Sequence, residues 1–229
     1  ASKSPRRREL LSSIGYPIRF VDISVDEKLD FPVPSDKVAE TLALLKSDGF
    51  STDLLNEDDV LVTADTVVVH NDFVLGKPKD AQDAREMLLA LSGDKHQVYT
   101  GVCLKSREGR SLFTEKTDVW FKELSVEEIA YYIDNYKPFD KAGAYGIQDW
   151  IGMIGISKIE GCYYNVMGLP MARLYNSSKV SPPSPTMRLT IALTAPLFAS
   201  ISTAQADLTS FLPSMVTRSW ASTTAMKSI

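Results

Sequence analysis

Asp65 is the residue of this sequence best placed to do chemistry, because it stands inside an apolar, β-branched run, VLVTADTVVVH at residues 60–70. Such a run predicts a buried strand, and a carboxylate within it is costly to bury unless it is paired or binds a metal. We therefore expect Asp65 to face a cleft, where it could bind Mg²⁺ or act as a base on an attacking water. Glu27 could supply a second carboxylate, with a plain surface acid as the alternative.

A cluster of arginines follows Ser4 and Pro5, in the segment SPRRR at residues 4–8. Ser4 suits an N-cap and Pro5 the first position of a helix. Cations at a helix N-terminus oppose its dipole, at about 0.3–1 kcal/mol each. An anion held by the free backbone N–H groups, Arg6 and Arg7 would offset this cost, so the segment is a candidate triphosphate clamp. A solvated basic face is the alternative.

Two lysines and one glutamine complete the candidate chemistry. Lys77 lies between Gly76 and Pro78, on a rigid turn from which it could reach a phosphate. Lys46 falls late in an expected helix. The loop DKAGAYGIQ at residues 140–148 contains two glycines that permit close approach to a ligand, and Gln148 can donate and accept, which suits recognition of a base edge. Solvated lysines and an ordinary turn are the alternatives.

Helices and strands that alternate along the chain must position these residues. We expect a first helix from Ser4 to about Gly15. Ser125 and Glu128 form a capping-box pattern, which predicts a helix to about Tyr136. The other expected elements are helices at 35–48 and 80–91, strands at 18–25, 60–70, 73–75, 96–106, 111–121, 151–158 and 162–167, and a short helix from Leu169.

The composition argues against several classes of function. The chain has 229 residues and a net charge of -4, which disfavours non-specific binding to nucleic acid. Two cysteines and two histidines form no zinc pattern and no disulfide framework, and two reduced thiols in a cytoplasmic protein are expected. No apolar run has the length of a membrane span, so no association with a membrane is expected.

The character of the sequence changes after Lys179. SPPSP at residues 181–185 is typical of a linker, and residues 187–206 resemble a secretory signal peptide. We therefore expect a domain at residues 1–179 and a tail at residues 180–229 to which no function is assigned. A fused or mis-framed gene end and an amphipathic or disordered tail both explain the tail.

Taken together, the motifs resemble the Maf family over residues 1 to about 176, in the family's order and spacing. The resemblance implies an α/β fold like that of inosine triphosphate pyrophosphatases, with an elongated mixed sheet flanked by helices and a central cleft between two lobes. It also implies a cytoplasmic nucleoside triphosphate pyrophosphatase, a hydrolase of acid anhydrides that uses Mg²⁺ or Mn²⁺. The matching segments are SKSPRRREL (2–10), VDE (25–27), LALLK (42–46), TADTVV (63–68), GKP (76–78), LSGDKHQVYTGV (91–102), DKAGAYGIQ (140–148) and GCYYNVMGLP (161–170).

The resemblance also implies roles for individual residues. Asp65 matches the family's catalytic acid, and Asp65 with Glu27 would hold the metal. Arg6, Thr66 and Gln148 match positions that set specificity, and this set resembles the subgroup that acts on dTTP and UTP, with modified pyrimidine nucleotides as further candidates. Other active-site positions of the family are matched by Ser4, Arg7, Glu27, Lys46 and Lys77.

Several alternatives stay open beside this interpretation. The protein could be a non-enzymatic, nucleotide-binding regulator of septum formation, or a pyrophosphatase for methylated GTP. The inosine triphosphate group and a secreted protein are weaker rivals. Family members are often dimers, so a homodimer is one expected state. In the family an apolar strand precedes the SPRR motif, and here the sequence begins at Ala1, so we expect that strand to be largely missing.

Overall fold

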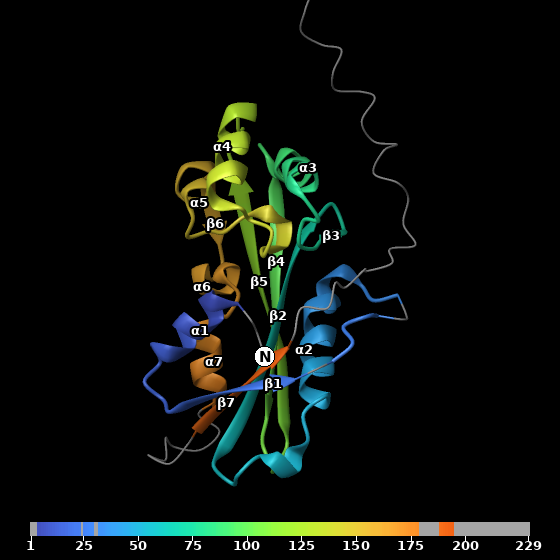
Figure 1. Cartoon of the computed structure of the whole chain (residues 1–229), viewed down its shortest axis with the longest axis vertical. Coiled ribbons are helices and arrows are strands. Elements are labelled where there is room, and N and C mark those ends of the chain that lie inside the picture. The colour runs from blue at the N-terminus through green and yellow to red at the C-terminus, as the bar shows by residue number, and fades with distance from the viewer. Residues whose placement is uncertain (1–3, 24, 30–31, 179–187, 195–229) are drawn as a thin grey trace, which may run out of the picture. The chain divides into compact units, whose positions relative to one another are not determined.

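The structure is a computed structural model that describes residues 4–23, 25–29, 32–178 and 188–194. Within these ranges the strands form one mixed sheet of seven strands in the order β1-β7-β2-β4-β5-β6, with β3 paired to β2 (Figure 1). Strands β2 to β6 pair antiparallel, whereas β7 lies parallel to both β1 and β2. The strands are β1 (Ile18–Ile23), β2 (Asp59–His70), β3 (Phe73–Leu75), β4 (Lys95–Lys105), β5 (Arg110–Phe121), β6 (Ile156–Glu160) and β7 (Arg188–Thr194).

Helices flank the sheet, and α1 and α2 pack on opposite faces of it (Figure 1). Successive strand residues point to opposite faces, so Ala64 of β2 packs in the core cluster of α1 and Val67 in that of α2. The helices are α1 (Pro5–Ser12), α2 (Val38–Asp48), α3 (Ala81–Leu91), α4 (Val126–Tyr136), α5 (Trp150–Gly155), α6 (Tyr163–Met167) and α7 (Met171–Ser178), with 3-10 turns η1 (Ser35–Lys37), η2 (Thr52–Leu54) and η3 (Ala142–Ala144).

Helix α2 lies directly on the strands that carry the candidate acid. Gly101 of β4 is the register partner of Asp65, and a Cβ at Gly101 would lie 2.4 Å from backbone atoms of Ala39 in α2. The Thr63 hydroxyl donates to the carbonyl oxygen of Ala43 at 2.7 Å. The glycine therefore permits close packing and the threonine anchors the helix, which together place Lys46 above β2.

The loop at residues 140–148 is fixed against the end of β2. Gly143 has a positive φ of 66°, and its N–H donates to the carbonyl oxygen of Gly76 at 2.9 Å. A Cβ at Gly143 would meet Val68 side-chain atoms at 3.0–3.1 Å, so both the backbone conformation and the available space favour glycine here. The loop and the Gly-Lys-Pro turn therefore lie next to each other.

Most of the expected elements agree with the structure, including the strands within residues 18–121 and the capping box of Ser125 and Glu128. Two predictions were wrong. Residues 151–155 continue helix α5 and only 156–160 form a strand, and residues 162–167 contain helix α6 in place of a strand. A short apolar run does not distinguish helix from strand by periodicity, and in α6 the buried Asn165 makes tertiary contacts that override the local propensity of two tyrosines and a valine.

Strand β7 comes from the part of the chain that we expected to lie outside the domain. The structure places residues 188–194 inside the sheet. A strand buried on both faces is a nearly continuous apolar run, and so is the core of a signal peptide, which is why composition did not separate the two. The linker at 181–185 and residues 195–229 lie outside the described residues.

Among the described residues, no helix has the length and apolar character that crossing a membrane requires. Cys103 is buried and Cys162 is partly buried, and both are free thiols.

Candidate active site

The centre of the candidate site is a cluster of one lysine and two carboxylates. Asp65 stands in the middle of β2, and its carboxylate is paired with the ammonium group of Lys46. The same ammonium lies 3.3 Å from Oε2 of Glu27, which belongs to the segment after β1. The Lys46 side chain is only 5% exposed, so three charged groups share one shielded volume in which two negative charges face one positive charge.

The carboxylate of Asp65 is held in its ionised form. Burial by itself raises the pKa of this group, but the charges of Lys46 and Arg7 oppose burial and outweigh it. Hydrogen bonds act in the same direction, from Lys46 and from the N–H of Thr66, which donates to Oδ1 at 2.7 Å. The net pKa lies below the ordinary value of 3.8. Asp65 is therefore a carboxylate at neutral pH, which is the form that a metal ion needs in a ligand.

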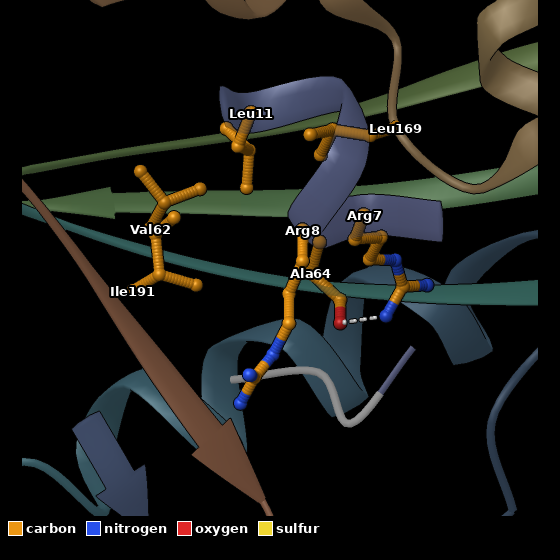
Figure 2. Close-up of a pocket in the computed structure, with 7 residues that line it drawn as sticks. All are labelled: Arg7, Arg8, Leu11, Val62, Ala64, Leu169 and Ile191. Atoms are coloured by element: carbon orange, nitrogen blue, oxygen red, sulfur yellow. Dashed lines mark hydrogen bonds between the residues drawn. The ribbon is translucent and has the colours of Figure 1, made fainter. Parts of the chain in front are cut away.

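Arg7 connects three separate parts of the site. Its Nε donates to the carbonyl oxygen of Gly168 at 2.6 Å, and its Nη1 donates to that of Ala64 at 2.9 Å (Figure 2). Its Nη2 donates to the hydroxyl of Thr66 at 2.6 Å. Because these bonds engage all three nitrogens, the guanidinium fixes helix α1 to β2 and to the turn after α6.

Thr66 continues this network into the core. Its hydroxyl lies 2.9 Å from the hydroxyl of Thr100 on β4. The Thr100 hydroxyl donates to the carbonyl oxygen of Asn165 at 3.1 Å. The side-chain nitrogen Nδ2 of Asn165 donates to the carbonyl oxygen of Val98 and to the hydroxyl of Thr117. Sequence reasoning did not identify Thr100 and Asn165. Their signal was a polar residue in an otherwise apolar stretch, and both prove to be fully buried.

Arg6 points to a different part of the site from Arg7. Its Nη1 forms an ion pair with Oδ2 of Asp140 at 2.9 Å, and Lys141 lies 2.8 Å from the other carboxylate oxygen. Burial raises the pKa of Asp140, whereas Lys141 and Arg6 lower it, and the net pKa is below the ordinary value. Helix α1 is thereby joined to the loop at residues 140–148.

Tyr132 of α4 holds the same loop through two hydrogen bonds of its hydroxyl. The Tyr132 hydroxyl donates to Oδ2 of Asp149 at 2.7 Å and accepts the N–H of Gly146 at 3.2 Å. Gln148, between these two anchors, has a buried Oε1 that accepts no hydrogen bond from the described part of the protein. A buried, unpaired acceptor is costly, and a ligand that donates to it would remove the cost.

The structure brings some of the predicted residues together directly and others through backbone. Ion pairs join Asp65, Lys46 and Glu27, and hydrogen bonds join Arg7 to Thr66. Lys77 is exposed. It lies beside the loop at residues 140–148, because the preceding residue, Gly76, accepts a hydrogen bond from the N–H of Gly143 in that loop. The other predicted residues are Ser4, which is the N-cap of α1, Arg6 on the first turn of that helix, and Gln148 on the loop.

Asp65 and Glu27 are the residues of this cluster that could hold a divalent cation. Across residues 4–23, 25–29, 32–178 and 188–194, no three histidine, cysteine or acidic side chains are grouped as a metal site. Asp65 and Glu27 both reach the ammonium of Lys46, so they are close enough to act as a pair. Mg²⁺ commonly takes one or two carboxylates and completes its shell with waters and phosphate oxygens.

Comparison with known proteins gives one family and a consistent set of relatives. The family described as Maf-like protein matches residues 1–179. A protein of Bacteroides thetaiotaomicron named dTTP/UTP pyrophosphatase is 46% identical over 181 residues, which cover 78% of this chain and 93% of the relative. A protein of Porphyromonas gingivalis with the same name is 48% identical over 182 residues, with 78% and 90% covered. A third, from Christiangramia forsetii, is 44% identical over 179 residues, with 78% and 91% covered.

Proposed function

The chain belongs to the Maf family, and we propose that it hydrolyses dTTP and UTP to the nucleoside monophosphate and pyrophosphate. The observation that carries the proposal is the shielded cluster of Asp65, Lys46 and Glu27. Relatives that are 44–48% identical and bear the name dTTP/UTP pyrophosphatase support the choice of reaction. In this reaction a water oxygen attacks the α-phosphorus, the bond from that phosphorus to the bridging oxygen breaks, pyrophosphate leaves, and one proton is released.

Asp65 is proposed as the catalytic residue. Its lowered pKa makes it a weak base that is ionised at neutral pH. It can orient the attacking water as a hydrogen-bond acceptor and take the proton as the new P–O bond forms. Glu27, which also contacts the ammonium of Lys46, would add a second acceptor.

A divalent metal, Mg²⁺ or Mn²⁺, is part of the proposal. Asp65 and Glu27 would hold it, and when bound it neutralises charge on the phosphate oxygens. Lysine and arginine side chains of the protein would neutralise the remaining negative charge on the phosphates. Lys46 contacts both carboxylates, and we propose that Lys77 and Arg6 meet the β- and γ-phosphates. Ser4, at the N-cap of α1, would add its hydroxyl, and the first turn of that helix would add backbone N–H groups.

Arg7 is proposed to act by position. Its three nitrogens already donate to Gly168, Ala64 and Thr66, so it fixes α1 and its neighbour Arg6 relative to β2. Gln148 is proposed to recognise the pyrimidine, because its buried Oε1 can accept the N3–H that uracil and thymine share. Thr66 would support this recognition from β2.

We also propose where the enzyme works and how many copies of the chain it contains. Nucleoside triphosphates are cytoplasmic metabolites, so we place the enzyme in the cytoplasm, and we propose a homodimer in keeping with the family. Light scattering coupled to size-exclusion chromatography measures the mass of the assembly directly.

The decisive experiment measures pyrophosphate release from dTTP, UTP, CTP, GTP, ITP and methylated GTP with Mg²⁺. We expect fast release from dTTP and UTP, and a loss of about 100-fold or more in Asp65→Asn. Asp72→Asn, an exposed turn residue with positive φ, is the matched control and should keep the full rate. Full activity in Asp65→Asn would refute the catalytic assignment. A folded protein that binds dTTP without turnover would favour a nucleotide-binding regulator.

A further inference from the structure

Strand β7 has an unusual position relative to the part of the chain that matches the family. That match ends at residue 179, whereas β7 begins at Arg188. Yet β7 lies inside the sheet, between β1 and β2, and not at its edge. A segment from beyond the matched region therefore occupies an interior place in the domain.

The pairing of β7 joins β1 to the rest of the sheet. Among the described strands, β1 pairs with β7 alone, in a register that runs from Ile18 opposite Leu189 to Ile23 opposite Thr194. On its other side β7 pairs with β2, where Val60 is opposite Leu189. The N–H of Leu189 also donates to the carbonyl oxygen of Pro17 at 3.0 Å. Without β7, strand β1 would have no hydrogen-bonded neighbour in this sheet.

The side chains of β7 that the structure describes, those of residues 189–191, are buried on both faces of the sheet. Leu189 and Thr190 are 0% exposed and Ile191 is 4% exposed. Leu189 and Ile191 belong to the same core cluster as Leu10 and Leu11 of helix α1. The contact buries apolar surface of α1 and β7 together, so β7 contributes to holding α1 on the sheet.

The contact continues into the candidate site. Ile191 lines a small pocket together with Arg7, Leu11 and Ala64, and Figure 2 shows it beside Val62, beneath α1. Arg7 donates to the carbonyl oxygen of Ala64, the residue before Asp65. A loss of β7 would therefore loosen α1 at the point where its arginine is fixed to the strand that carries the candidate acid.

We propose that residues 188–194 are an integral strand of the catalytic domain, which completes the sheet in cis and holds α1 and Arg7 in position. The domain then extends beyond residue 179, and residues 188–194 of the segment that resembles a signal peptide serve as a strand of the sheet. The structural part of this proposal is independent of the reaction, and only its effect on turnover rests on the proposed function.

Disulfide trapping in the full chain tests the position of the strand. Val60→Cys with Leu189→Cys joins register partners, and Val60→Cys with Ile191→Cys is the matched pair that is two residues out of register. After oxidation, we expect the first pair to form an intramolecular disulfide at least about five times faster than the second, as mapped by proteolysis and mass spectrometry. Equal rates in the two pairs, or a disulfide between two chains, would overturn the proposal.

Thermal unfolding of single variants tests the contribution of the strand. Thr190→Pro removes a ladder N–H and clashes in an interior strand, so we expect its unfolding midpoint to fall by about 5–10 °C. Thr190→Val keeps the shape and the backbone bonds and should stay within about 3 °C of the parent. A midpoint for Thr190→Pro equal to that of Thr190→Val would contradict an integral strand.

Turnover of dTTP completes the test, at a temperature where both variants are folded by circular dichroism. We expect Thr190→Pro to lose about tenfold or more in kcat/KM and Thr190→Val to retain its rate. Turnover that is equal in both folded variants would refute the link from β7 to the site. If the parent itself released no pyrophosphate, the proposed reaction would fail, and trapping and unfolding would still decide whether β7 is in place.

Discussion

At the scale of single residues, the candidate site is organised around one lysine. The ammonium of Lys46 satisfies Asp65 and Glu27 at once, and each carboxylate would otherwise stand near a like charge in a shielded volume. Such an arrangement stabilises the fold only while all three partners are present, because removal of one leaves uncompensated charge.

Replacement of Lys46 should therefore destabilise the protein as well as abolish turnover. We expect Lys46→Met to lower the free energy of unfolding by about 2–3 kcal/mol at pH 7, because two carboxylates then face each other. Adding Asp65→Asn removes one of them and should restore more than about 1 kcal/mol, as denaturant titration would measure. If the double variant were less stable than Lys46→Met, repulsion between the carboxylates would not be the cause.

The lowered pKa of Asp65 sets the direction of its effect on stability with pH. A carboxylate whose folded pKa lies below 3.8 contributes stability that is full above the unfolded pKa and is lost as the pH falls through the folded pKa. The loss attributable to Asp65 should therefore appear only below about pH 4. Denaturant titrations between pH 5 and pH 3 would show it as a slope that is reduced in Asp65→Asn.

At this scale the sequence named candidate residues, but not how they connect. The charge in an apolar strand singled out Asp65, and the structure shows its carboxylate paired with Lys46. Arg7 was expected to contact phosphate, and the structure shows its nitrogens engaged by the protein. Thr100 was not identified, because a hydroxyl in a strand becomes informative only when its partner from another element is known.

At the scale of elements, close packing of α2 on β4 positions Lys46. Gly101 has no room for a side chain, since a Cβ there would lie 2.4 Å from the backbone of Ala39. The helix would have to move away from the strand to accommodate even a methyl group. Because Lys46 lies on that helix opposite Asp65, such a movement would open the ion cluster.

Gly101→Ala should therefore affect both stability and turnover. We expect a loss of about 1–3 kcal/mol in the free energy of unfolding, typical of overpacking, together with a decrease in kcat/KM of at least about tenfold. Gly76→Ala is the control for stability, because a Cβ at Gly76 meets nothing within 4 Å. Equal stabilities for the two variants would show that α2 can shift without penalty.

The elements that the sequence did not predict share a physical reason. Helix α6 contains two tyrosines and a valine, which favour strands. The segment is nevertheless a helical turn, because the buried Asn165 in it donates hydrogen bonds to both β4 and β5. Strand β7 was not recognised because its partners lie far away in the sequence. Local patterns predicted the elements whose environment is local, such as α4 with its capping box.

At the scale of the whole molecule, one buried histidine ties stability to pH. His96 is fully buried, and its Nε2 lies 2.7 Å from the hydroxyl of Tyr145, which belongs to the loop of Gln148. Burial, with a smaller effect of the charge on His70, lowers the pKa of His96 to about 3, although Asp94 acts in the opposite direction. The native protein therefore keeps this imidazole neutral throughout the range in which an unfolded chain would protonate it.

The sign of this effect is opposite to that of a histidine that gains an acidic partner. Below about pH 6.5 the unfolded state binds a proton that the native state does not. The free energy of unfolding therefore decreases as the pH is lowered, by up to about 1.4 kcal/mol per pH unit, until the pH approaches 3. His96→Gln should flatten the decline between pH 7 and pH 5 by about 2 kcal/mol. Tyr145→Phe, which keeps the histidine, should retain the parental slope. Parallel profiles for parent and His96→Gln would exclude His96 as the source.

The pairing of β1 with β7 has a consequence for synthesis of the protein on the ribosome. Arg19 and Thr190 are in contact across a sequence separation of 171 residues. Chains emerge from the N-terminus onward, and contacts this distant are slow to form because a long loop must close first. Strand β1 is translated well before β7, which is its only neighbour among the described strands of the sheet. Until β7 has been translated, the backbone groups of β1 have no partner in the sheet, and chaperones would find them accessible.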